Sequence, residues 1–255
     1  MHLKPVVRYL YSVVPGLAAS RFAVMDMTAA WAAKPEYAGT SWFSIGDGLI
    51  IDVGANRGQS TAAFKSQAPK ARIFAFEPEP RSAARLSERF RDDAFVTVQD
   101  CALGAQSGTI TFFVPSYGRW ECDGMAATDR ATATDWLKDP GRMLRFDENK
   151  VDVKEYAVAC KTLDSYNLSP SLIKLHAQGA ELDILKGSIE TIRRSRPALM
   201  CAFATNAFTE LAAQFGYLPY IYKNETFFPG IAQRPVTFTW YLSDHHRPLT
   251  PIKST

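Results

Sequence analysis

Short apolar runs alternate with longer segments of helical periodicity from residue 49 onward, a pattern typical of a parallel sheet flanked by helices. The pattern predicts seven strands, at 49–53, 72–76, 95–98, 172–176, 198–203, 218–222 and 236–242. It also predicts helices at 58–68, 80–91, 180–194 and 208–215. Pro69 ends the first helix, and Pro80 occupies the first turn of the second, where a missing N–H costs nothing. The chain is therefore expected to be an α/β protein.

Two segments depart from this rhythm. Residues 109–114 alternate β-branched and aromatic side chains and predict an additional half-buried strand. Residues 115–150 are irregular and are predicted to form a loop-rich insertion, the kind of segment that often serves as a lid or binding loop. Residues 45–245 then form the main domain and 246–255 a tail. Residues 1–44 are predicted to be a helical extension that either caps an acceptor site or forms a homodimer contact.

Composition narrows the class of protein. A hydrophobic content of 47% with 22% charged residues indicates a globular chain, and a net charge of +3 is too small to favour nucleic-acid binding. No apolar run reaches the roughly 18 residues of a membrane span. The apolar run near the N-terminus is broken by Pro15 and Gly16, which argues against a signal peptide, so a cytoplasmic protein is expected. The four cysteines lack metal or redox spacing and are expected to be reduced, and only four histidines argue against a metal site.

The most informative segment is a strand that enters a glycine loop and then a helix, at residues 50–60. Gly54 and Gly58 allow a sharp turn close to a ligand. A dinucleotide fingerprint would place its second glycine where this chain has Asn56. Asp52 is expected to point a carboxylate at the ligand, which would repel a pyrophosphate but suit an ammonium and a sulfonium. The loop therefore favours S-adenosylmethionine.

Two further segments fit an adenosine cofactor. Glu77 follows the second strand, where a carboxylate can accept both ribose hydroxyls. Asp100 follows the third strand and either accepts the exocyclic amine of adenine or is simply a turn residue, and Cys101 or Ala102 would line the ring. The predicted cofactor-binding residues are Asp52, Gly54, Asn56, Gly58, Ser60, Glu77, Pro78, Asp100 and Cys101.

Taken in order, several segments resemble the signature of the FkbM-type methyltransferase family. The matching segments are 52–58, 74–78, 102–108, 162–164, 173–187 and 196–197, within residues 45–205. The resemblance implies a class I, Rossmann-like sheet of seven mostly parallel strands, with helices on both faces and an antiparallel C-terminal strand. It also implies transfer of a methyl group from S-adenosylmethionine to a hydroxyl, often on a sugar or a secondary metabolite.

The chain departs from the family pattern at the expected reaction centre. His176 stands where the family has an aspartate, and residues 200–204 lack the expected acid. An imidazole can replace the aspartate as a base, or it can mark a site that has lost its chemistry. We take His176 and Glu181 as the catalytic candidates. The aromatic residues Tyr117, Trp120 and Trp136 either line an acceptor pocket or belong to the core.

Three functions compete. The first is an O-methyltransferase that acts on a hydroxyl of a sugar or a secondary metabolite. The second is a catalytically degenerate protein that binds S-adenosylmethionine as a scaffold or partner, favoured by the missing acids. The third is a nicotinamide-dependent oxidoreductase, disfavoured by Asn56 and by the pair of C-terminal strands.

Overall fold

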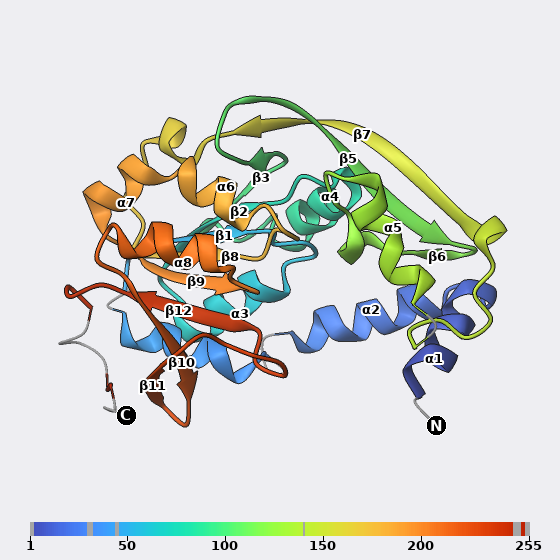
Figure 1. The fold of residues 1–255 in the computed structure, drawn as a ribbon, viewed down its shortest axis with the longest axis horizontal. Coiled ribbons are helices and arrows are strands. Elements are labelled where there is room, and N and C mark those ends of the chain that lie inside the picture. The colour runs from blue at the N-terminus through green and yellow to red at the C-terminus, as the bar shows by residue number, and fades with distance from the viewer. Residues whose placement is uncertain (1–2, 30–32, 44–45, 140, 247–250, 253–255) are drawn as a thin grey trace.

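The computed structural model describes residues 3–29, 33–43, 46–139, 141–246 and 251–252, which form two sheets and their surrounding helices (Figure 1). The main sheet has eight strands in the order β11-β10-β12-β9-β8-β1-β2-β3. Strands β3, β2, β1, β8 and β9 pair in parallel, and β12 runs antiparallel between β9 and β10. Its strands are β1 (Leu49–Val53), β2 (Arg72–Phe76), β3 (Val96–Gln99), β8 (Leu172–Leu175), β9 (Ala198–Ala202), β10 (Leu218–Lys223), β11 (Thr226–Pro229) and β12 (Phe238–Leu242).

This sheet confirms the predicted α/β fold of the class I methyltransferase type, mostly parallel with an antiparallel strand at the C-terminus. The predicted number of seven strands is wrong by one, because β11 lies in a segment that the sequence pattern assigns to a connector. Asn224 and Glu225 both adopt positive φ, at 49° and 59°, and close a tight hairpin between β10 and β11. Glutamate at the second position gives no hairpin signal in the sequence.

The two faces of the main sheet carry separate apolar cores. Along β1, Ile50 packs on one face, and its neighbours Leu49 and Ile51 pack on the other. The first face is covered by η1 (Pro35–Trp42), α3 (Gln59–Gln67) and α4 (Pro80–Arg89). The second face is covered by α6 (Glu181–Lys186), α7 (Ile189–Ser195) and α8 (Asn206–Ala213). The prediction of helices on both faces is therefore confirmed.

A second sheet of four strands occupies a region where the sequence pattern predicts one strand and a loop-rich insertion. Its order is β4-β7-β5-β6. The long strands β5 and β7 pair antiparallel over their whole length, and α5 packs beside them (Figure 1). The prediction of a largely irregular segment at 115–150 is wrong for β6, α5 and the end of β5. The elements are β4 (Ala102–Leu103), β5 (Gly108–Tyr117), β6 (Trp120–Glu121), η2 (Asp123–Met125), α5 (Arg130–Lys138), η3 (Glu148–Lys150) and β7 (Val151–Lys161).

Two helices, α1 (Leu3–Val13) and α2 (Leu17–Thr28), precede the main sheet and lie at the margin of the molecule near β6 and α5 (Figure 1). Tyr11 of α1 packs against Trp120 at a ring distance of 5.9 Å, in a cluster that also contains Leu137 of α5. The helices are thus joined to the second sheet through an apolar cluster of their own.

The four cysteines are free and buried, as predicted. In the described ranges, no helix is long and apolar enough to cross a membrane. The same residues contain no cluster of three or more histidine, cysteine, aspartate and glutamate side chains that would suit a metal ion.

The predicted helix at 180–194 is interrupted at Gly187. A Cβ atom added to Gly187 would lie 2.0 Å from the carbonyl oxygen of Gly104, so only glycine allows this close approach between backbones. The helix restarts as α7, and Asp164 of η4 (Leu163–Tyr166) accepts hydrogen bonds from Glu190 N at 3.1 Å and Thr191 N at 2.7 Å. Asp164 therefore caps α7 from a distant part of the chain.

We expect Asp164→Ala to lower the free energy of unfolding by about 1–2 kcal/mol, because it leaves two N–H groups of the first turn of α7 without an acceptor. Urea unfolding followed by circular dichroism measures this change. The matched control is Asp183→Ala, since Asp183 is exposed and, among the residues that the structure describes, its ion pair is with Lys186. Its effect should stay below about 0.5 kcal/mol. Equal effects of the two variants would contradict the capping role.

Candidate functional site

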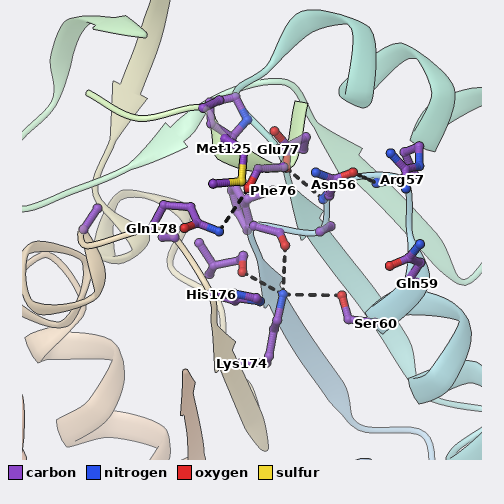
Figure 2. A pocket seen from close by; sticks show the side chains of 18 of the residues that line it. Asn56, Arg57, Gln59, Ser60, Phe76, Glu77, Met125, Lys174, His176 and Gln178 are labelled. Carbon is purple, nitrogen blue, oxygen red and sulfur yellow. Dashed lines mark hydrogen bonds between the residues drawn. The ribbon is translucent and has the colours of Figure 1, made fainter. Parts of the chain in front are cut away.

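A cavity of about 540 Å³ lies at the carboxyl ends of β1, β2 and β8, within the size range of small-molecule sites. Its floor includes residues 53–57 and 76–78, and its other walls come from α2 and from residues 120–128. Figure 2 shows Asn56 and Glu77 on one side of this space and His176 and Gln178 on the other. The carboxyl edge of a parallel sheet is where such folds bind ligands.

The loop after β1 depends on its glycines for packing. Gly54 has φ of 69°, and an added Cβ would lie 2.0 Å from the carbonyl oxygen of His176. Gly58 has φ of 82°, and its Cβ would collide with Phe90 and Leu86. Gly54 borders the cavity, whereas Gly58 faces these apolar side chains and does not. Of the two predicted ligand-facing glycines, the structure therefore places only Gly54 at the cavity.

Asn56 has φ of 49° and lies in the left-handed region, which asparagine tolerates better than most residues other than glycine. Its side-chain oxygen accepts a hydrogen bond from Arg57 N at 2.7 Å. Its own N–H donates to Glu77 Oε2 at 2.8 Å. Asn56 borders the cavity and joins the loop after β1 to the end of β2.

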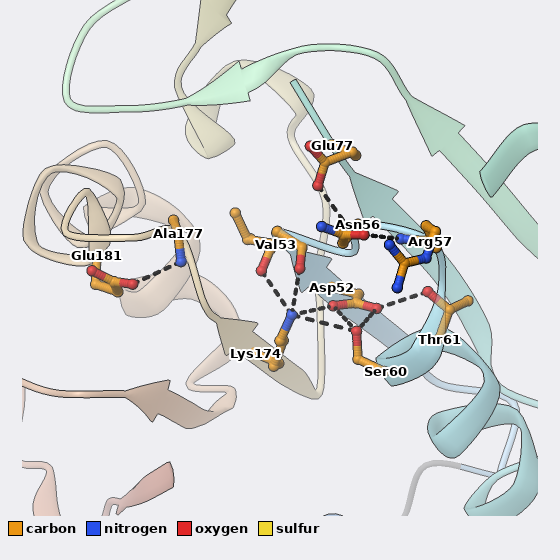
Figure 3. A network of polar contacts seen from close by, with 11 residues as sticks. Asp52, Val53, Asn56, Arg57, Ser60, Thr61, Glu77, Lys174, Ala177 and Glu181 are labelled. Atoms are coloured by element: carbon orange, nitrogen blue, oxygen red, sulfur yellow. Dashed lines mark hydrogen bonds and ion pairs between the residues drawn. The ribbon is translucent and has the colours of Figure 1, made fainter. Parts of the chain in front are cut away.

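A fully buried ion pair lies beneath this loop (Figure 3). Lys174 Nζ lies 2.9 Å from Asp52 Oδ1 and donates to the carbonyl oxygens of Val53 and Gly54, at 3.0 and 2.9 Å. The Asp52 carboxylate also accepts hydrogen bonds from the hydroxyls of Ser60 and Thr61, at 2.7 Å each. Lys174 of β8 thus fixes both the carboxylate and the backbone of the loop.

This arrangement corrects the prediction for Asp52. Its side chain is fully buried and does not border the cavity, because its oxygens are directed inward to Lys174 and to the two hydroxyls. Ser60 does border the cavity while its hydroxyl donates to Asp52. Sequence reasoning missed the role of Lys174, although it lies in the segment that carries the family resemblance.

Glu77 lies at the end of β2 and borders the cavity together with Pro78. Its two carboxylate oxygens accept hydrogen bonds from Asn56 N at 2.8 Å and Glu79 N at 2.9 Å. Burial raises the pKa of Glu77 to about 7, since the charged form loses its contact with water, although both N–H donors oppose this shift. A carboxylate offers about four lone-pair sites, so two remain for a ligand.

The third predicted segment follows β3, and only part of it borders the cavity. Asp100 is exposed and does not border the cavity, which favours the second of its two interpretations, a residue of the chain turn without contact to a ligand. Cys101 and Ala102 do border the cavity. The Cys101 thiol lies 3.3 Å from the Tyr166 hydroxyl, which in turn donates to Gln99.

His176 follows β8 and borders the cavity. Its ring packs edge-on against Phe203 and Phe238, with ring distances of 5.8 Å in both cases. Burial, followed by the positive charges of Lys174 and Lys34, lowers the pKa of His176 to about 3. The imidazole is therefore neutral at neutral pH.

The second catalytic candidate, Glu181, does not border the cavity. Its carboxylate accepts a hydrogen bond from Ala177 N at 2.7 Å (Figure 3). It accepts another from Gly179 N at 2.9 Å. Both carboxylate oxygens are engaged in the turn that carries the chain from β8 into α6. The structure therefore does not bring Glu181 together with His176 at the cavity, and Glu181 orders the backbone that follows His176.

The opposite wall comes from α2 and the segment around β6. All three predicted aromatic residues belong to the apolar cluster that holds α1, and of these only Trp120 also borders the cavity. Asp26 of α2 accepts hydrogen bonds from Arg57 Nε at 3.2 Å and from Gln59 at 3.1 Å. An ion pair and an amide hydrogen bond thus connect α2 directly to the loop after β1.

Comparisons with known proteins agree with this arrangement. The sequence profile of the family described as "Methyltransferase FkbM domain" matches residues 52–227. This range includes the glycine loop, Glu77, Lys174 and His176. The chain belongs to this family. Along the chain, the matched range runs from the end of β1 into β11 and includes the second sheet. Strand β12 of the main sheet follows the matched range.

Two curated relatives match part of this FkbM chain. The 2-O-methyltransferase NoeI of Sinorhizobium fredii is 29% identical over 155 residues, which cover 59% of this chain and 61% of NoeI. Methyltransferase 1 of Beauveria bassiana is 26% identical over 146 residues, which cover 55% of this chain and 58% of that protein. The match thus spans about three fifths of the length of each relative.

Among solved structures, a methyltransferase FkbM from Methylobacillus flagellatus superposes with a TM-score of 0.48 at 14% identity. The superposition covers 91% of this chain and 62% of that chain.

We expect Lys174→Met to lower the free energy of unfolding by about 3–5 kcal/mol, because it leaves the Asp52 carboxylate buried without a counter-charge. The double variant Asp52→Asn with Lys174→Met should be more stable than Lys174→Met alone, since it also removes the buried charge. Urea unfolding of the wild type, both single variants and the double variant gives the coupling energy of the pair. A coupling near zero would contradict the ion pair.

Proposed function

We propose that this chain transfers a methyl group from S-adenosylmethionine to a hydroxyl of a small-molecule or sugar acceptor. The observation that carries the proposal is the Glu77 carboxylate, held at the cavity by two backbone N–H groups with lone pairs to spare. The family membership and the similarity to a 2-O-methyltransferase support the same reaction.

The residues at the cavity fit an adenosine cofactor. Glu77 would accept hydrogen bonds from the ribose hydroxyls, which lie on the cofactor of every class I methyltransferase. Gly54 and Asn56 would form the wall beside it, and Cys101 and Ala102 would lie against the adenine ring. When bound, the cofactor supplies a methyl group on a positively charged sulfur, which an acceptor oxygen can displace.

His176 is suited to receive the proton of the acceptor hydroxyl late in the reaction. A neutral imidazole with a pKa of about 3 is too weak to deprotonate an alcohol beforehand. Methylation of a neutral hydroxyl produces a protonated ether, which is a far stronger acid than this imidazolium. His176 would accept that proton through a ring nitrogen and release it to water. Most of the rate would then come from alignment of the acceptor in the cavity.

The alternative function is that of a non-catalytic protein that binds S-adenosylmethionine. The FkbM chain lacks an acid both at His176 and in residues 200–204, which favours a protein that binds S-adenosylmethionine without using it. The cofactor site is the same for both functions, so only transfer of the methyl group separates them.

We expect binding of an adenosine ligand to weaken as the pH falls through about 7, because ribose hydroxyls donate to the ionised form of Glu77. The suitable probe is 5′-methylthioadenosine, which has no amino acid part that titrates near neutral pH. Calorimetric titration should give a dissociation constant roughly 30-fold larger at pH 5.5 than at pH 8, or about tenfold per pH unit below the pKa.

Variants of Glu77 provide the control for this titration. Glu77→Gln should weaken binding by about tenfold or more at pH 8 and remove the pH dependence, since a charged acceptor has been lost. Glu88→Gln changes an exposed residue of α4 and should leave both unchanged. Two results would overturn the proposed cofactor site. One is tight binding of NAD in place of S-adenosylmethionine, and the other is an unchanged dissociation constant in Glu77→Gln.

Methyl transfer itself is tested with methyl-labelled S-adenosylmethionine and a panel of sugars, phenols and amines. We expect labelled products only with hydroxyl acceptors, and a kcat without an ionisation between about pH 5.5 and 8, because His176 stays neutral throughout. His176→Gln should lower kcat by about 100-fold while 5′-methylthioadenosine still binds.

The possible results separate the two functions. An unchanged kcat in His176→Gln would contradict its part in proton transfer. Cofactor binding without any methylated product would favour the non-catalytic function.

A further inference from the structure

An apolar surface lies on α1, on α2 and on the turn between them. Half of the exposed large apolar side chains in the described ranges belong to residues 10–27. Met27 is 82% exposed and Val24 is 59% exposed, which makes them the most exposed of the group. We call this surface the α1–α2 face, formed by Leu10, Val13, Val14, Leu17, Val24 and Met27.

Helix α2 has two apolar sides, and only one of them is covered. On the covered side, Phe22 and Met25 form part of the cavity wall. Leu17 and Val24 are seven residues apart, which places them on one stripe of a helix, and Met27 follows three residues later on the same side. The side chains of this second stripe are exposed, and α2 itself lies at the margin of the molecule (Figure 1). Monomeric proteins seldom expose large apolar patches, so six exposed apolar side chains on two contacting helices point to a partner.

Charge identifies the kind of partner. Residues 3–25 contain the basic residues Lys4, Arg8 and Arg21 and no acidic residue. Lys4 of α1 and Arg21 of α2 are both exposed. The nearest acid along the chain, Asp26, is turned inward in its ion pair with Arg57. A second copy of this chain would bring like charges together across a two-fold axis, whereas an anionic surface would complement them.

We propose that the α1–α2 face docks on the surface of an anionic lipid bilayer. The apolar side chains would enter the boundary between headgroups and acyl chains, as those of interfacial amphipathic helices do. Lys4 and Arg21 would lie among the lipid phosphates, where basic residues next to an apolar surface gain from the negative potential. Docking of this kind is peripheral.

Docking on a bilayer would also restrict the kind of acceptor that reaches the cavity. This inference rests on the proposed function. The same helix that would lie on the bilayer borders the cavity with Phe22 and Met25. An acceptor that carries a hydroxyl on a lipid-attached headgroup would therefore reach the cavity along α2 without leaving the membrane surface.

The test is co-sedimentation of the full chain with vesicles of phosphatidylcholine alone and with vesicles that contain about one third phosphatidylglycerol. We expect binding to the anionic vesicles at least about tenfold stronger than to the neutral ones, and weaker binding as salt is added. The double variant Val24→Glu with Met27→Glu should lose this binding.

The matched control is Phe95→Glu with Ile231→Glu, which adds the same charge at exposed apolar positions outside the α1–α2 face and should keep the binding. Titration with 5′-methylthioadenosine shows whether each variant is folded. Absence of vesicle binding in a wild type that binds the nucleoside would overturn the docking proposal alone. Equal binding to both vesicles would also overturn it, and so would a wild-type dimer that the Val24 and Met27 substitutions convert to a monomer.

Discussion

The ion pair between Lys174 and Asp52 is the contact on which the rest of the site depends. Two opposite charges without access to water are stable only if each is fully hydrogen-bonded, and here both are. Lys174 uses its remaining donors on the backbone of Val53 and Gly54, so the end of β8 determines the course of the loop after β1. That loop in turn positions Asn56 for its hydrogen bond to Glu77 at the end of β2. One buried contact thus connects three neighbouring strands.

The sequence was sufficient to predict most of the main sheet, because its strands are short apolar runs bounded by glycine and proline. It was insufficient where a local signal was weak. The hairpin at Asn224 and Glu225 lacks the usual glycine, so β11 was missed. Strand β7 alternates polar and apolar side chains at residues 151–161 and could have been found, but its partner strand is about 40 residues earlier. The end of β4 meets the end of α6 where Gly104 and Gly187 approach, a contact that no local pattern encodes.

The sequence predicted most of the residues that border the cavity. It did not predict which groups the charged side chains contact. Gly54, Asn56, Ser60, Glu77, Pro78, Cys101 and His176 all border the cavity. The differences concern three acids and one glycine. Asp52 and Glu181 use their oxygens for structure, Asp100 faces water, and Gly58 packs against Phe90 and Leu86. A lysine inside the apolar run at 172–175 is itself a signal, because a charge in a central strand requires a counter-charge nearby. Which acid supplies it depends on the pairing of β1 with β8, which is a tertiary feature.

Asp26 connects the N-terminal helices to the loop after β1. It lies on α2 outside the region matched by the family, yet its carboxylate binds Arg57 and Gln59 within that region. Arg89 adds a third connection, since its guanidinium donates to the carbonyl oxygens of both Arg57 and Asp26. Exchange of the N-terminal helices between homologous enzymes would therefore require a carboxylate at the position of Asp26. A chimera without it would remove the acceptor of the hydrogen bond from Arg57 Nε, a buried group beside the loop after β1.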